Sequence, residues 1–231
     1  MRVLLAGDTH GEFQHVLSCS HEADAIIFLG DQTPKRDFKS ELGAVADKSW
    51  FVLGNHDSDH LEFLQNHKSM LHRCLHCTVE EFGGIRVAGL NGIFMRRFLG
   101  LSNVDLLKDL YSLKPFYHSR RDCLWYRSLG YEYLTAIFPE DIEHMIELQA
   151  DVLVCHEAPE CHRHGFMMLG DLARTMGVKL LIHGHHHERY EDVIEEGIKV
   201  VGLGPPGEFD PITEQDEGLD WLHHLYPWQI A

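Results

Sequence analysis

The sequence predicts an α/β fold, because short apolar runs of strand length alternate with polar segments of helical character. Apolar runs at residues 2–7, 25–30 and 50–54 each have the length and composition of a buried strand. A polar cluster directly follows each run. Open α/β sheets place their functional groups beyond the carboxyl ends of the strands, so we expect the three clusters to share one edge of the sheet.

After the third strand, the sequence predicts two β-hairpins, one helix and two single buried strands. In chain order these are a hairpin of residues 79–82 and 85–90, a helix from Pro139 to about Ala150, strands at 151–155 and 179–182, and a hairpin of 190–194 and 198–203. Gly83 and Gly84 provide the turn of the first hairpin. Pro139 suits the first position of a helix, where its missing N–H is not needed.

Residues 91–140 interrupt this succession of strands and polar clusters. The segment is rich in Phe, Tyr, Leu and Arg at helical spacing, so we interpret it as an inserted helical cap. It carries seven Lys and Arg against five Asp and Glu, whereas the whole chain has a formal net charge of −16. An anionic substrate would favour this segment, and Arg96 and Arg97 are candidate substrate contacts. The alternative is that these arginines form a solvated helical face.

Length and composition restrict the class of protein. The 231 residues can form one substantial core, and we expect a single domain followed by an acidic tail from about residue 207. No apolar run approaches the roughly 20 residues that cross a bilayer, so we expect no membrane association. Six cysteines in a chain of this size indicate reduced thiols and a cytoplasmic location. The acidic charge argues against an extended nucleic-acid interface.

Side chains that bind divalent metal ions stand at five predicted strand ends. In chain order they are Asp8 and His10, Asp31, Asn55, His156, and His185 with His187. Each residue alone could be an ordinary cap or turn residue, but the complete set favours metal binding. Carboxylate and imidazole ligands suit Mn, Fe, Zn, Ni or Co. A carboxylate such as Asp31 can bridge two ions about 3.5–4 Å apart, an arrangement that serves hydrolysis at phosphorus.

In this order the motifs resemble those of the calcineurin-like metallophosphoesterases. The corresponding motifs are Gly7-Asp8-Thr9-His10, Gly30-Asp31, Gly54-Asn55-His56-Asp57, His156, and Gly184-His185-His186-His187. The resemblance extends over nearly the whole chain. It implies a four-layer α-β-β-α sandwich of two mixed β-sheets flanked by helices, here with the inserted cap. It also implies hydrolysis of a phosphomonoester or phosphodiester.

The resemblance further implies a role for each residue of the motifs. The first ion would bind Asp8, His10, Asp31 and His187, and the second would bind Asp31, Asn55, His156 and His185. We expect manganese, with Fe, Zn, Ni or Co as alternatives. A hydroxide that bridges the two metals would attack phosphorus, and His56 would protonate the leaving oxygen as a general acid. Asn55 would also contact the small phosphorylated substrate.

The chain departs from the protein serine/threonine phosphatase branch of the superfamily. That branch has Gly-Asp-x-x-Asp-Arg-Gly, whereas Pro34 stands here in place of the acid that would orient the catalytic histidine. The sequence therefore leaves open whether Asp57, or no group, orients His56. Two other functions remain as alternatives: a partner-binding scaffold that has lost catalysis, and a nuclease. The complete ligand set disfavours the scaffold, and the acidic charge disfavours the nuclease.

Two further motifs contain metal-type residues outside the predicted ligand set. His183 and His186 flank the ligand pair, but alternation aims them the other way, so we expect packing or hydrogen bonds. Cys74-Leu75-His76-Cys77 has the spacing of a zinc motif, but no second pair follows it, so we expect no zinc there.

Overall fold

The computed structural model describes residues 1–95, 131–204 and 228–229. Most of the predicted cap at 91–140 and of the tail from residue 207 lies outside the described residues. The single-domain organisation stays a prediction. The described residues contain no helix long and apolar enough to cross a membrane.

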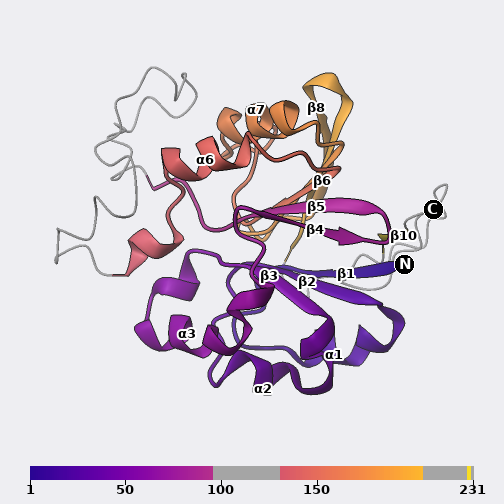
Figure 1. Ribbon diagram of the computed structural model, residues 1–231. Helices are drawn as coiled ribbons and strands as arrows, with labels where there is room; N and C mark the ends of the chain where they lie inside the picture. The colour runs from indigo at the N-terminus through magenta and orange to yellow at the C-terminus, as the bar shows by residue number, and fades with distance from the viewer. Residues whose placement is uncertain (96–130, 205–227, 230–231) are drawn as a thin grey trace.

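Two β-sheets lie face to face at the centre of the molecule (Figure 1). The first has the order β10 (Trp228–Gln229), β1 (Arg2–Ala6), β2 (Ala25–Leu29), β3 (Ser49–Val52). The second has the order β4 (Thr78–Phe82), β5 (Ile85–Leu90), β6 (Val152–Cys155), β7 (Leu180–His183), β9 (Ile198–Gly202), β8 (Tyr190–Ile194). Strands β1, β2 and β3 are parallel, as are β5, β6, β7 and β9. Antiparallel β10, β4 and β8 at the edges make both sheets mixed.

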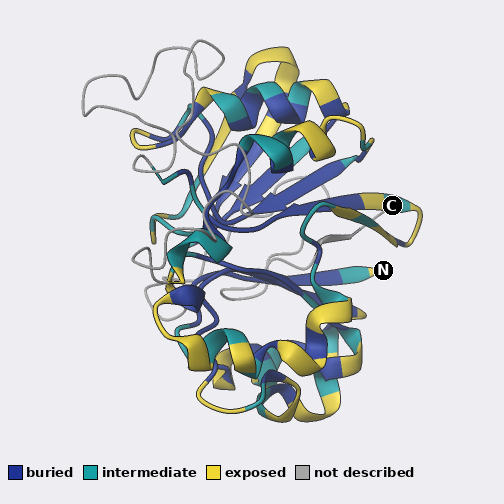
Figure 2. Cartoon of the chain, turned by 60° about the vertical axis from the view of Figure 1, so that its left-hand side comes forward, coloured by how far each residue is buried: buried dark blue, intermediate teal, exposed yellow. Residues whose placement is uncertain are grey.

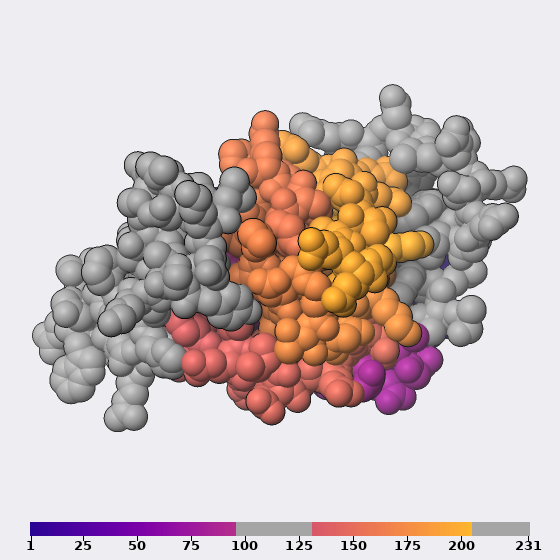
Figure 3. Space-filling view, turned by 90° about the horizontal axis from the view of Figure 1, so that it is seen from above, coloured from indigo at the N-terminus to yellow at the C-terminus, as the bar shows by residue number. Residues whose placement is uncertain are grey.

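Helices cover the outer face of each sheet. On the first sheet these are α1 (Gln14–Cys19), α2 (Phe38–Leu42) and α3 (Leu61–Asn66), and on the second α6 (Pro139–Met145) and α7 (Met167–Met176). Short 3-10 helices connect the elements: η1 (Ser20–Glu22), η2 (Gly43–Lys48), η3 (His56–Ser58), η4 (Lys68–Arg73), η6 (Glu132–Thr135) and η7 (Glu195–Gly197). Seen from the side of the second sheet, the described part of the surface belongs largely to residues 131–204 (Figure 3). The predicted α-β-β-α sandwich is therefore confirmed.

Three apolar clusters hold the four layers together. Side chains such as Leu5, Ile27 and Val154 fill the space between the sheets. A second cluster packs α1 and α2 against the first sheet, and a third packs α6 and α7 against the second. The central strands are buried on both faces, which explains why they read as continuous apolar runs rather than alternating ones (Figure 2).

The predicted strands agree with the structure to within two residues at each end, and the larger difference is at one helix end. Both hairpins form as expected, but the helix that begins at Pro139 ends at Met145 instead of about Ala150. The N–H of Ala150 donates to Met176 O, which draws the chain out of the helix toward α7. Five cysteines lie among the described residues, and none of them forms a disulfide bond with another of the five. The cytoplasmic location stays a prediction.

Candidate metal centre

Loops at the carboxyl ends of five strands, from both sheets, carry the predicted ligands. Asp8 and His10 follow β1, Asp31 follows β2, Asn55 follows β3, His156 follows β6, and His185 with His187 follows β7. A backbone hydrogen bond joins the loops after β1 and β2: the N–H of His10 donates to Asp31 O at 2.9 Å. Across the two sheets, the N–H of His185 donates to the Asp8 carboxylate at 3.1 Å. The structure thus brings all five loops to one centre.

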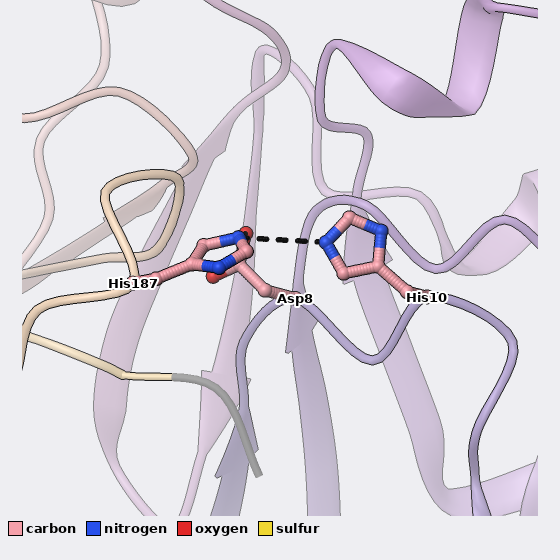
Figure 4. A group of neighbouring side chains, drawn as sticks. All are labelled: Asp8, His10 and His187. Atoms are coloured by element: carbon pink, nitrogen blue, oxygen red, sulfur yellow. Dashed lines mark hydrogen bonds and ion pairs between the residues drawn. The ribbon is translucent and has the colours of Figure 1, made fainter. Parts of the chain in front are cut away.

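Asp8, His10 and His187 form the first ligand group, in which one potential ligand atom of each residue lies within 4.8 Å of the others. The Nε2 atoms of His10 and His187 are 3.4 Å apart (Figure 4). His187 Nε2 is also 3.5 Å from Asp8 Oδ1. The hydrogen bond with the Asp8 carboxylate raises the pKa of His187. Two imidazole nitrogens and a carboxylate directed at one point are a suitable donor set for a divalent cation.

Asp31, His156 and His185 form the second ligand group. Asn55 extends it, because Asn55 Oδ1 lies 3.2 Å from His156 Nε2. His156 Nδ1 donates to Leu29 O at 2.7 Å, so Nε2 is the nitrogen that faces the group. A backbone acceptor on the far nitrogen is the usual way to fix the tautomer and orientation of a metal-binding histidine.

The charges of Asp31 and His156 stabilise each other within the second ligand group. Asp31 Oδ2 and His156 Nε2 are 3.3 Å apart and buried. Burial opposes ionisation of Asp31, but His156 outweighs it and lowers the pKa of Asp31 to about 2. Burial likewise disfavours the charged form of His156, but Asp31 raises the pKa of His156 to about 10. Burial lowers the pKa of His185 to about 4, so this ring is neutral near pH 7 and keeps a lone pair for a metal.

The partners of the Asp31 carboxylate oxygens show whether the site suits a bound cation. Its Oδ1 atom accepts the N–H of His56 at 2.8 Å. Its Oδ2 atom is buried, and its close partner among the residues described is His156 Nε2 at 3.3 Å. A buried carboxylate is costly unless it is paired with a cation or coordinates a metal. Without an ion the pair requires a protonated His156, whereas a bound cation would stabilise Asp31 beside a neutral imidazole. The residues therefore fit divalent ions, whereas the bridging of two ions by Asp31 stays a prediction.

The backbone is strained at five of the seven predicted ligands. Residues Asp8, His10, Asp31, His185 and His187 have left-handed φ values between 44° and 73°. Such conformations are uncommon outside glycine and cost roughly 1–3 kcal/mol each when the surrounding structure imposes them. The loops therefore hold these side chains in position at the expense of backbone energy, which is typical of functional sites.

Close packing explains the glycines of two motifs. A Cβ atom at Gly30 would lie 2.2 Å from His156 Nδ1, and one at Gly54 would lie 2.2 Å from Asp31 Oδ1. Neither distance is compatible with a side chain. The Gly-Asp and Gly-Asn-His motifs are thus required by the approach of the second ligand group to the loop backbone.

His56 lies beside the first ligand group, with its ring centroid 5.6 Å from that of His10. Asp59, which the sequence analysis missed, orients it: His56 Nδ1 and Asp59 Oδ2 are 2.6 Å apart. Asp57 does not have this role, because it is fully buried and accepts backbone N–H groups from Thr33 and Gly54. The available signal for Asp59 was its spacing of three residues from His56, which places both side chains on one face of a helical turn.

The two flanking histidines differ. His183 Nε2 bonds to Tyr190 Oη at 2.7 Å, in agreement with the predicted hydrogen-bonding role. His186 Nε2 lies 3.5 Å from Glu157 Oε1, and these two residues form a further group of potential ligands with His185. The sequence analysis gave Glu157 no role, although it directly follows His156. Arg96 and Arg97 lie outside the described residues, so their predicted substrate contacts stay predictions.

His76 and Cys77 of the zinc-like motif lie near Asp141, in another group of potential ligands. His76 Nδ1 accepts the N–H of Asn91 at 3.2 Å, so the neutral ring carries its proton on Nε2. That atom is 3.3 Å from Asp141 Oδ1, while Asp141 Oδ2 accepts the N–H of Phe138 at the start of α6. The group is therefore explained as a hydrogen-bonded anchor of α6, and we assign no ion to it.

Comparison with known proteins defines the class to which this fold and site belong. A family model described as calcineurin-like phosphoesterase matches residues 1–189. A protein of Haemophilus influenzae without a described function is 36% identical over 207 residues, which cover 87% of this chain and 90% of the relative. The chain therefore belongs to the calcineurin-like phosphoesterase family.

Solved structures share the fold at low sequence identity. A dimetal phosphatase from Danio rerio has a TM-score of 0.56 at 12% identity, with 89% of this chain and 87% of that chain covered. The phosphopantetheinyl hydrolase of Mycobacterium tuberculosis has a TM-score of 0.50 at 13% identity, with 98% and 95% covered. At these identities the likeness shows the common fold.

Proposed function

We propose that this protein is a dinuclear-metal-dependent hydrolase that cleaves a phosphomonoester or a phosphodiester. One observation carries the proposal: ligand-type side chains from five strand ends form two groups of potential metal ligands, and the second contains the buried Asp31 carboxylate. The family membership supports the same chemistry.

The two ligand groups correspond to two cation positions. In this proposal, the first ion is held by Asp8, His10, Asp31 and His187, and the second by Asp31, Asn55, His156 and His185. Bound divalent ions at such a pair of sites lower the pKa of water and neutralise charge on phosphate oxygens. We propose manganese, because these oxygen and nitrogen ligands suit it, with Fe, Zn, Ni and Co as competitors.

The protein's own groups supply the proton and the orientation. His56 gives a proton to the leaving oxygen, and the Asp59 carboxylate fixes its ring through Nδ1, which leaves Nε2 to face the substrate. Asn55 contacts both the substrate and the second ion. The strained loops keep the ligands in place before substrate arrives, which reduces reorganisation during the reaction.

The substrate that we propose is a small phosphorylated molecule. The formal charge of −16 opposes binding along a nucleic-acid backbone, which depends on clustered Lys and Arg. Two proteins of the same fold are a dimetal phosphatase and a phosphopantetheinyl hydrolase, and both names describe hydrolases. Arg96 and Arg97 remain candidate contacts to the substrate phosphate.

The test combines metal analysis with a substrate panel. The purified protein is depleted of metal, reloaded with Mn²⁺ and assayed against p-nitrophenyl phosphate, bis-p-nitrophenyl phosphate and alkyl esters. We expect two ions per chain and hydrolysis of at least one ester class, both lost in Asp31→Asn. Full activity in Asp31→Asn or in the metal-free protein would show that the proposed function is wrong.

A further inference from the structure

Two 3-10 helices that are distant in sequence meet beside the metal centre. Ser58 is the last residue of η3 and Thr135 is the last residue of η6. Their hydroxyl oxygens are 2.5 Å apart, and both residues are buried, with 1% and 0% exposure. The contact therefore connects the turn that carries Asn55 and His56 to a segment nearly 80 residues further along the chain.

The direction of this hydrogen bond follows from the neighbouring acceptors. Each hydroxyl has one proton to donate. Ser58 Oγ lies 3.1 Å from Asn55 O, whereas Thr135 Oγ1 lies 3.4 Å from Glu132 O. The shorter distance favours donation from Thr135 to Ser58 and from Ser58 to Asn55 O. The Ser58 N–H donates to the same carbonyl at 3.3 Å. The backbone of Asn55 is thus held by Ser58 and, through it, by Thr135.

Thr135 itself occupies a fixed position. Its carbonyl oxygen accepts the N–H of Ile93 at 3.0 Å, and a Cβ atom on Gly92 would lie only 2.0 Å from that oxygen. The N–H of Gly92 in turn donates to Leu53 O at 2.7 Å, just before the Asn55 turn. The Thr135 hydroxyl is therefore presented to Ser58 from a backbone that is itself bonded, through Gly92, to Leu53, the residue after β3.

The other bonds of the turn do not restrain the same atom. His56 N–H donates to Asp31, and Gly54 N–H donates to Asp57. Neither bond reaches the carbonyl of Asn55. Among the residues described, the Ser58 and Thr135 hydroxyls form the side-chain connection to that group, next to the residue whose amide oxygen faces His156.

We propose that Thr135 is a positioning residue of the metal centre, acting through the Ser58 hydroxyl on the Asn55 and His56 turn. The inference rests on the proposed function, because it assumes that Asn55 binds the second ion and that His56 serves the leaving group. Loss of the Thr135 hydroxyl leaves the buried Ser58 oxygen without its donor and loosens the Asn55 side chain. Binding of the second ion is weakened as a result.

Calorimetric titration of the full-length, metal-free protein with Mn²⁺ tests this proposal. We expect Thr135→Val, which keeps the side-chain shape, to weaken the higher-affinity site, which the buried second group forms, by roughly 10-fold, the lower end of the effect of residues that support metal ligands. Thr135→Ser retains the hydroxyl and should restore binding to within about twofold of wild type. Ser58→Ala removes the middle of the chain of hydrogen bonds and should reproduce the Thr135→Val effect.

A matched control is Thr175→Val, which removes a hydroxyl bonded to Asp171 O on the exposed face of α7. It should leave Mn²⁺ binding and hydrolysis unchanged. If Thr135→Val and Ser58→Ala lower the melting temperature but bind Mn²⁺ like wild type, Thr135 is merely structural and the proposal is wrong. If one variant does not fold, the other decides. Wild-type protein that binds two ions but hydrolyses no ester would disprove the proposed function, and the titration would still decide the role of Thr135.

Discussion

The two ligand groups of the centre differ in their access to solvent. His187 of the first group has a side chain that is 45% exposed, whereas His156 of the second group is fully buried. His156 is also locked by a backbone carbonyl, but His10 and His187 face one another with their Nε2 atoms. The second group is therefore built into the core, and the first group forms the open side of the centre.

This difference assigns separate tasks to the two groups. A buried, prearranged set of ligands favours retention of its ion, while an exposed set permits exchange and the approach of substrate. His56 lies on the open side, near His10. We therefore expect substitutions in the second group to damage both stability and activity, and substitutions in the first group to damage activity mainly.

The largest expected effect comes from Asp31→Asn. The substitution removes the negative charge that pairs with His156 and, in the proposed centre, the carboxylate that both ions share. We expect the rate of ester hydrolysis to fall by at least about 10²-fold, the upper range even for residues that only support ligands. Initial rates at saturating Mn²⁺ measure the loss, and a smaller decrease would contradict the central position of Asp31.

His156→Ala and His187→Ala compare the two groups directly. The first leaves the buried Asp31 carboxylate without its partner, which should cost about 3–5 kcal/mol of unfolding free energy in the metal-free protein. The second removes a half-exposed ring, and Asp8 keeps the N–H of His185 as a donor, so the cost should be smaller, about 1 kcal/mol. Urea unfolding in the presence of EDTA measures both. Equal losses would show that burial does not distinguish the groups.

The strands and the ligands could both be predicted from the sequence, because each apolar strand ends directly before a polar ligand residue. Buried parallel strands must be apolar throughout, so the runs before Asp8, Asp31 and His156 are recognisable, and the first polar residue marks the strand end. The division of these strands between two sheets could not be predicted from the apolar pattern. Periodicity cannot show it, because strands of both sheets are buried on both faces, and only the family resemblance implied it.

The contacts between side chains at the site could not be predicted from the sequence. Asp59 orients His56 only because η3 forms a helical turn, and this turn follows from the bonds of Asp57 and Ser58 with distant residues. The meeting of Ser58 and Thr135 joins residues 77 positions apart, and no local pattern encodes such a contact. The end of α6 at Met145 is likewise set by tertiary hydrogen bonds.

The pH dependence of stability should separate the groups in the metal-free protein. The pKa of His156 is raised from 6.5 to about 10, so its stabilising contribution is complete below pH 6.5 and is lost as the pH rises toward 10. The pKa of Asp31 is lowered from 3.8 to about 2, so its contribution is complete above pH 3.8 and is lost toward pH 2. The pair is thus most stabilising between about pH 4 and 6.5.

Melting temperatures of the EDTA-treated protein between pH 4 and 9 measure this dependence. We expect a decrease above pH 6.5 that His156→Ala abolishes and His187→Ala largely retains. Saturating Mn²⁺ should also remove the decrease, because a cation then stabilises Asp31 without requiring a protonated imidazole. A pH profile that is unchanged in His156→Ala would show that the Asp31 and His156 pair does not control the stability of the second group.

The smallest expected effect is that of Asp59→Asn, on the open side of the centre. Both partners are about half exposed, with 49% and 47% of the side chains accessible, and an exposed ion pair contributes at most about 1 kcal/mol, or about fivefold in rate. An alkyl phosphate needs protonation of its leaving oxygen, so its hydrolysis should slow by up to about fivefold. Hydrolysis of p-nitrophenyl phosphate, whose leaving group departs as a stable anion, should change less than twofold. Equal slowing of both esters would mean that Asp59 supports the fold of η3 rather than the proton donor, because a general loss of the turn does not discriminate between leaving groups.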